Sequence, residues 1–79
     1  MEQRIVSVAD FGSRIRKERK KQGLTQQQLA AFFASFSREF LSDLENGKPT
    51  VELGKALKVA SALGLRLMIA DGAKAEDTE

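Results

Sequence analysis

Residues 23–48 read GLTQQQLAAFFASFSREFLSDLENGK, and this stretch predicts two short helices joined by a tight break. Thr25 is a favourable N-cap for the first helix, which we expect to end near Ala34. Ser37 is suited to cap the second helix, which we expect over residues 38–46. Two short helices joined in this way and held between further helices are typical of a helix-turn-helix.

A longer helix is expected before this pair. Ser7 and Asp10 form the S-x-x-D pattern of a capping box, and Gly23 suits the left-handed residue that follows a helix. Residues 8–22 also show helical spacing along one face. That face contains Val8, Phe11, Gly12, Ile15 and Arg19.

A further helix is expected after the pair. Pro49 disfavours a helical Lys48, so a loop is predicted there. Thr50 can cap a helix over residues 51–63, which Gly64 ends. The buried face of this helix is predicted to contain Val51, Leu53, Ala56, Leu57, Ala60 and Leu63.

Residues 65–70, LRLMIA, alternate with the period of a strand, which places Leu65, Leu67 and Ile69 on one face. The chain itself offers only residues 3–6 as a partner, and an isolated strand is unstable. We therefore expect this strand to pair with its copy in a second subunit and to close a symmetric dimer. A domain of this length is marginal as a monomer, which favours self-association.

The predicted architecture is an all-α domain of four to five helices with a short C-terminal β-strand that pairs across a dimer. Residues 1–70 are expected to form one domain, because 79 residues leave no room for a second core. Residues 71–79, DGAKAEDTE, are expected to form a disordered acidic tail.

Missing residue types exclude several kinds of chemistry. The chain has no Cys and no His, which excludes disulfides, zinc–thiolate sites and imidazole catalysis. No metal or cofactor is expected, although carboxylates leave a metal site formally possible. No stretch approaches the ~20 apolar residues that span a bilayer, and the N-terminus lacks the apolar region of a signal peptide. The absence of Cys fits a cytoplasmic protein.

The net charge of +2 conceals an asymmetry. Residues 1–70 carry twelve basic and seven acidic side chains, a net charge of +5, whereas the tail is acidic. A basic domain suggests an anionic partner, with nucleic acid first, although a solvated basic surface explains the charge equally well.

The motifs GLTQQQLA at 23–30 and SREFLSDLENGK at 37–48 resemble the lambda-repressor-like (xenobiotic-response-element) helix-turn-helix family. The run GKPTVELGKALKVASALGLRL at 47–67 is more narrowly similar to HipB-type antitoxins. The resemblance implies a homodimeric, sequence-specific repressor of double-stranded operator DNA. The narrower resemblance implies a HipA-like kinase toxin as a further partner.

The resemblance also implies which residues meet the DNA backbone. Thr25 and Gln26 begin the first helix of the pair and would bond a phosphate through hydroxyl, amide and backbone N–H groups. Ser37 begins the second helix of the pair, which is the recognition helix. Asn46 and Lys48, in the loop after that helix, suit the backbone as well.

Three residues of the recognition helix would read bases. Arg38 offers a planar fork to the O6 and N7 atoms of guanine, and Glu39 can accept from the N4 group of cytosine. Ser42 lies one turn on from Arg38 and faces the same groove. Two alternatives stay open, because Arg38 can be an ordinary surface arginine and Glu39 can simply compensate the helix dipole.

Arg19 and Glu45 match a family pair that bridges the first helix to the end of the recognition helix, and such a pair would fix their relative orientation. The chain departs from the family in its turn, where residues 31–36 read AFFASF without the usual glycine.

Other residues have competing interpretations. Phe32, Phe33 and Phe36 are predicted to lie in the core, whereas a Phe36 turned outward would contact a partner. Asp43 near the groove would oppose DNA binding. The basic face of the first helix is interpreted as solvated, with DNA contact as the alternative; it carries Arg14, Lys17 and Lys21.

Competing functions are also open. Within DNA binding, the alternative is a stand-alone repressor of the phage or restriction-modification controller type. A protein-interaction module without operator binding belongs to a different class, as does a first helix that lies on an anionic membrane. Catalysis is not expected, because Asp43 and Glu45 are two residues apart on a helix and point to different faces.

Overall fold

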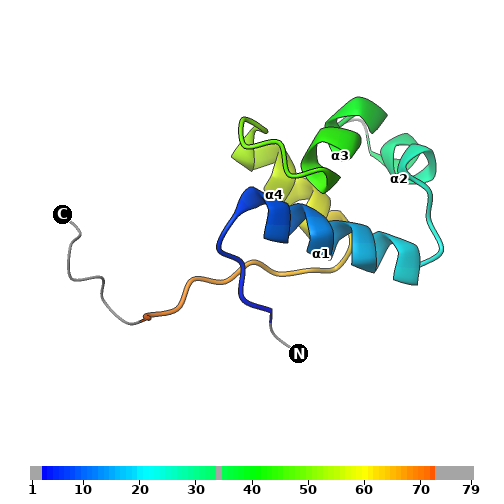
Figure 1. The fold of residues 1–79 in the computed structure, drawn as a ribbon. Coiled ribbons are helices and arrows are strands. Elements are labelled where there is room, and N and C mark those ends of the chain that lie inside the picture. The colour runs from blue at the N-terminus through cyan, green and yellow to red at the C-terminus, as the bar shows by residue number, and fades with distance from the viewer. Residues whose placement is uncertain (1–2, 34, 73–79) are drawn as a thin grey trace.

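The computed structural model describes residues 3–33 and 35–72, and within them the chain forms a bundle of helices (Figure 1). In chain order these are α1 (Val8–Lys21), α2 (Gln26–Phe32), α3 (Arg38–Glu45) and α4 (Leu53–Ala62). The helical part of the predicted fold class is thereby confirmed. None of the described helices is long and apolar enough to cross a membrane.

Local hydrogen bonds fix the start of the first three helices at the predicted residues. The hydroxyl of Ser7 accepts from the backbone N–H of Asp10 at 3.1 Å, and that of Ser37 accepts from Phe40 at 3.1 Å. Thr25 and Gln28 form a complete capping box, since each side chain accepts from the backbone N–H of the other. Each cap satisfies an N–H group that has no partner inside its own helix.

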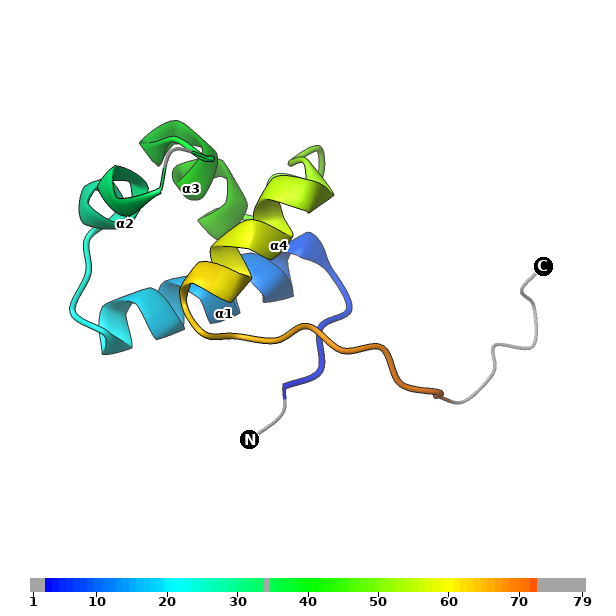
Figure 2. The same ribbon diagram turned by 180° about the vertical axis from the view of Figure 1, so that it is seen from behind.

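The core lies where α3 packs between α1, α2 and α4 (Figure 2). Five side chains are fully buried and hold these helices together: Ile15, Leu29, Leu41, Leu44 and Val59. The predicted inward face is buried at Ile15 in α1 and at Ala56, Ala60 and Leu63 in and after α4. Leu53 and Leu57 are instead exposed, and Val59, which the sequence did not place on this face, is fully buried. Helix α3 is therefore anchored by its apolar side chains and leaves its first turn in solvent.

Gly12 sets the closest approach between α1 and α3. A Cβ atom at this position would collide with the backbone carbonyl oxygen of Leu44, near the end of α3. Since no side chain fits there, a glycine is required by packing and not by backbone conformation.

The start of α4 differs from the prediction. Thr50 does not cap the helix, which begins at Leu53 after Glu52 and has no side-chain cap hydrogen bond. The backbone N–H of Val51 instead donates to the carbonyl oxygen of Lys48 at 3.2 Å, so Thr50 lies inside a turn. Pro49 favours this turn and delays the helix.

Residues 65–70 form no strand in the described part of the chain. The backbone N–H of Leu65 donates to the carbonyl oxygen of Ala60 at 2.8 Å, and no backbone hydrogen bond among the described residues involves 66–70. The segment leaves the helices in an open path (Figures 1 and 2). Among residues 3–33 and 35–72, strand pairing is therefore absent, including the pairing of 65–70 with residues 3–6. Most of the predicted acidic tail, residues 73–79, lies outside the described residues.

The aromatic side chains near the α2–α3 turn are not all buried, in contrast to the prediction. Phe36 is buried, and its ring stacks on Phe33 at 5.7 Å between centroids. Phe33 is 38% exposed and Phe32 is 68% exposed, so the prediction of core positions is wrong for these two. Helix α2 has only seven residues, and Leu29 is its one fully buried side chain.

Candidate nucleic-acid interface

The first turn of α3 carries an exposed group of polar side chains. Ser37, Arg38 and Glu39 are all exposed, while Leu41 and Leu44 further along the same helix are fully buried. Because the Ser37 hydroxyl closes the start of the helix, the direction in which Arg38 and Glu39 leave the surface is fixed by α3 itself. A base-reading helix requires this combination of a rigid support and free polar ends.

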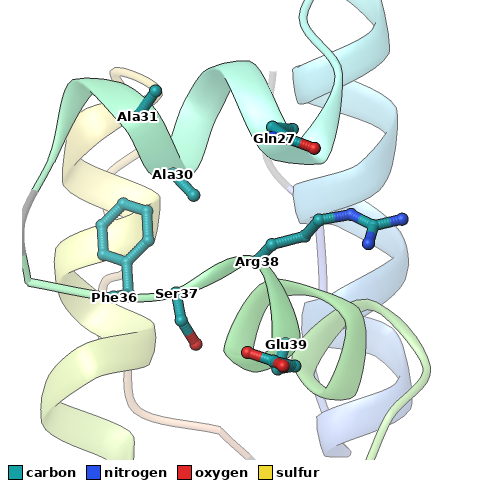
Figure 3. Close-up of a pocket in the computed structure, with 7 residues that line it drawn as sticks. All are labelled: Gln27, Ala30, Ala31, Phe36, Ser37, Arg38 and Glu39. Atoms are coloured by element: carbon teal, nitrogen blue, oxygen red, sulfur yellow. The ribbon is translucent and has the colours of Figure 1, made fainter.

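A shallow hollow of about 460 Å³ lies between α2 and the beginning of α3 (Figure 3). Phe36 and Ala31 lie toward one end of it, and Gln27 and Arg38 lie toward the other. The hollow is lined by Gln27, Ala30, Ala31, Phe36, Ser37, Arg38 and Glu39. It is therefore continuous with the side chains that the sequence predicts as base readers.

The end of α3 is held by a buried carboxylate with several donors. Arg19 donates to both oxygens of Glu45, at 2.7 and 2.8 Å, and its remaining terminal nitrogen donates to the carbonyl oxygen of Leu24 at 2.7 Å. Glu45 also accepts from Gln26 at 3.1 Å and from Arg16 at 3.3 Å. One carboxylate thus connects α1, the start of α2 and the end of α3.

The charge of Glu45 is stabilised despite its burial. Burial alone would raise the pKa of this carboxyl, but the hydrogen bonds from Arg19 and Gln26, together with the positive charge of Arg19, lower the pKa below its ordinary value. The hydrogen bond to Glu45 raises the pKa of Arg19. Both groups therefore remain ionised around neutral pH.

Gln26 and Thr25 are already engaged within the protein. The Gln26 amide nitrogen donates to Glu45, and Thr25 uses its backbone N–H and its hydroxyl oxygen in the capping box. An amide nitrogen carries two N–H donors and a hydroxyl can both accept and donate, so each side chain retains a donor. The contacts orient the groups that the sequence assigns to a phosphate.

Ser42 and Asn46 belong to a small polar group at the end of α3. The amide nitrogen of Asn46 lies 3.5 Å from the Ser42 hydroxyl, and the amide oxygen of Asn46 accepts from Arg16 at 3.2 Å. Ser42 is half-buried, unlike Arg38. The structure therefore exposes two of the predicted base readers in the first turn of α3 and leaves Ser42 half-buried one turn later, beside Asn46.

Asp43 and Lys48 form a partly exposed ion pair. The Lys48 ammonium lies 3.6 Å from a carboxylate oxygen of Asp43. This ion pair offsets the negative charge of Asp43, which would oppose DNA binding. It also engages Lys48, which the sequence predicts to contact the DNA backbone. Among the described residues, no group of three or more acidic side chains is placed to hold a metal ion.

Sequence reasoning did not single out Arg16, Gln27 or Ala31. Arg16 lies three residues before Arg19 and reaches the same carboxylate, so helical spacing could have indicated it. Gln27 and Ala31 are four residues apart on α2 and line the hollow. Only the packing of α2 against α3 brings them into one hollow with Arg38.

A pair of short helices with a supported, solvent-facing recognition helix defines a helix-turn-helix DNA-binding domain. A helix-turn-helix family model matches residues 15–68 of this chain. The HTH-type transcriptional regulator y4mF of Sinorhizobium fredii, described as uncharacterized, is 44% identical over 69 residues, which cover 87% of this chain and 90% of that protein. The chain therefore belongs to the lambda-repressor-like helix-turn-helix family of DNA-binding transcriptional regulators.

Solved structures extend this similarity to the fold. The chain is similar to HipB in an O4 20mer complex, with a TM-score of 0.81 and 24% identity over 91% of this chain and all of that one. It is equally similar to a HipB variant in an O2 20mer complex, with a TM-score of 0.81 and 23% identity over 92% of this chain and all of that one. At these identities the comparison defines the fold alone.

Proposed function

We propose that this protein is a homodimeric, sequence-specific repressor of the HipB type, which autoregulates its operon and acts as the antitoxin of a HipA-like kinase toxin. The observation that carries the proposal is the capped, exposed first turn of α3 in a fold shared with HipB in its O4 20mer complex. In this arrangement the dimer places its two recognition helices in successive major grooves, about 34 Å apart.

The proposed roles follow the contacts of each side chain. Arg38 and Glu39 read base edges, with Arg38 directed to guanine, and Ser42 reads from its half-buried position one turn further on. Thr25, Gln26, Ser37, Asn46 and Lys48 contact the backbone. The ion pair of Arg19 and Glu45 supports both sets, because it ties the start of α2 to the end of α3.

The proposed dimer uses residues 65–70. Leu65, Leu67 and Ile69 would form the apolar face of the paired strand; Leu67 is 44% exposed and Ile69 is 99% exposed, and exposed apolar side chains of this kind mark interaction sites. Pairing with the same segment of a second copy would bury these side chains and satisfy the open backbone of 66–70.

Operator selection tests the DNA-binding part of the proposal. We expect a palindromic site to be enriched from random duplex DNA and binding to weaken steeply with salt. Arg38→Ala should cost about 1–3 kcal/mol per half-site and relax the preference at one position, whereas Gln26→Ala should weaken all sequences alike. Unchanged discrimination by the Arg38→Ala protein would contradict the assignment of Arg38.

Co-expression with the neighbouring gene tests the antitoxin part. We expect the product of that gene to be kinase-like and to co-purify with this chain. A stable dimer that selects an operator without a toxin partner would favour the alternative of a stand-alone repressor. Retention of protein by random DNA with no enriched site would favour a protein-interaction module.

A further inference from the structure

The hollow between α2 and α3 has an apolar wall beside polar base readers. Its wall is made by Ala30, Ala31 and an edge of Phe36, and its opposite side is formed by Gln27 and Arg38 (Figure 3). Ala31 is exposed although it is part of this wall. The surface proposed to read bases therefore includes an apolar patch that cannot contact them through side-chain hydrogen bonds.

The chemistry of the major groove restricts what such a patch can contact. Purine and cytosine edges in this groove present hydrogen-bond donors and acceptors, whereas thymine adds a C5-methyl group. A methyl group gains free energy by leaving water for an apolar wall and needs no directed partner. We propose that the hollow receives the C5-methyl group of a thymine next to the base pair read by Arg38, with Ala31 as the specificity-determining residue.

This inference rests on the proposed function and deepens it. The hollow is continuous with Ser37, Arg38 and Glu39, so a duplex that brings bases to Arg38 also brings groove edges to Ala31. The hollow is shallow and open to solvent. It can therefore contact the edge of a base that remains within its duplex. The predicted operator therefore contains a thymine at a fixed step from the guanine read by Arg38.

Two parallel selections test the inference with the full-length chain. One random duplex library contains thymine, and the other contains deoxyuridine at every thymine position, so the libraries differ only in the C5-methyl group. We expect both libraries to yield sites with the guanine preference of Arg38, and the thymine preference at one neighbouring position to weaken when uracil replaces it. On the selected site, a single thymine-to-uracil exchange should weaken binding about fourfold per half-site, since it removes one buried methyl group.

A substitution in the hollow tests whether the thymine methyl group binds there. Ala31→Leu fills the space with an exposed side chain on a helix, and we expect the variant to bind the thymine and uracil duplexes equally. Ser13→Leu adds the same side chain at an exposed position of α1 that does not line the hollow, and it should keep the fourfold difference.

The outcomes separate this inference from the function on which it rests. Enrichment of no site from either library would contradict operator binding itself. Enriched sites that are insensitive to uracil at every position would overturn the methyl contact alone. A fourfold difference that persists in Ala31→Leu would move the contact to another residue and overturn the role of Ala31.

Discussion

The helix-turn-helix and the segment that follows α4 differ in how well their side chains are satisfied within a single copy of the chain. In residues 8–46 the buried charge of Glu45 is matched by donors from α1 and α2, and no described buried side-chain nitrogen or oxygen atom lacks a hydrogen-bond partner. Residues 65–70 instead leave apolar side chains in water, with Ile69 almost completely exposed.

This difference separates the interactions that fold the chain from those that need a partner. The first region satisfies its polar groups and buries its apolar ones within a single copy. The second region leaves its apolar groups exposed in the described part of a single copy, and exposed apolar surface of this kind marks interaction sites. Substitutions in the two regions should therefore change different properties, namely unfolding in the first and association in the second.

The largest effect on folding is expected from Glu45→Ala. This change leaves the buried Arg19 guanidinium without its counter-charge and should cost about 3–5 kcal/mol of unfolding free energy. Denaturant unfolding followed by circular dichroism measures the loss. Glu52→Ala is the matched control, because Glu52 is exposed and should change stability by less than about 0.5 kcal/mol. Equal stability of the two variants would contradict the structural role of Glu45.

A pair of glycine substitutions gives the next largest contrast. Gly12→Ala should cost about 1–3 kcal/mol, because the added methyl group meets the backbone of α3. Gly54→Ala should instead stabilise the chain by up to about 1 kcal/mol, because it lies in α4 and meets only the flexible end of the Glu52 side chain. Thermal unfolding of both variants measures the difference. A Gly12→Ala protein as stable as Gly54→Ala would show that α1 and α3 are free to separate.

A smaller effect is expected when the pH is lowered. The folded-state pKa of Glu45 lies below its ordinary value of 4.5, so its contribution to stability is present above the unfolded pKa and is lost as pH falls through the folded pKa. The melting temperature should therefore decrease below about pH 4.5. Glu45→Gln should be less stable than the native chain near neutral pH and lose less on acidification. Parallel curves for the two proteins would exclude Glu45 as a source of acid sensitivity.

The smallest effect on folding is expected in the C-terminal segment. Replacing both Leu67 and Ile69 with Ser should leave the helices intact and abolish the proposed dimer, as measured by light scattering. The melting temperature of the native chain should rise with protein concentration, whereas that of the variant should not. Leu53→Ser, which alters an exposed apolar residue of α4, should keep the dimer. Loss of association in Leu53→Ser alone would place the contact on α4.

Local chemistry made much of the fold predictable. Ser7, Thr25 and Ser37 each cap a helix through a residue three positions further on, so the capping signal lies within one turn of sequence. The same reasoning failed at Thr50, because the turn at Lys48–Val51 competes for that residue. Neighbours in sequence determine a helix start only where no alternative turn involves them.

The candidate site was predictable in part for the same reason. The sequence placed Arg38 and Glu39 in the first turn of α3, where the structure exposes them. It gave no indication that Gln26 would donate to Glu45 or that Lys48 would pair with Asp43. It also placed Phe32 and Phe33 in the core, because an apolar side chain on a short helix does not reveal whether another element covers it.

By itself, the sequence determined the helices, most of their caps and the type of domain, because those depend on residues a few positions apart. Tertiary structure decided which side chains meet across the fold. Arg19 and Glu45 are 26 positions apart, and Ala31 and Arg38 line the same hollow only because α2 packs against α3. The free energy of such contacts depends on the distance and burial that the complete bundle creates, and no short stretch of chain contains that information.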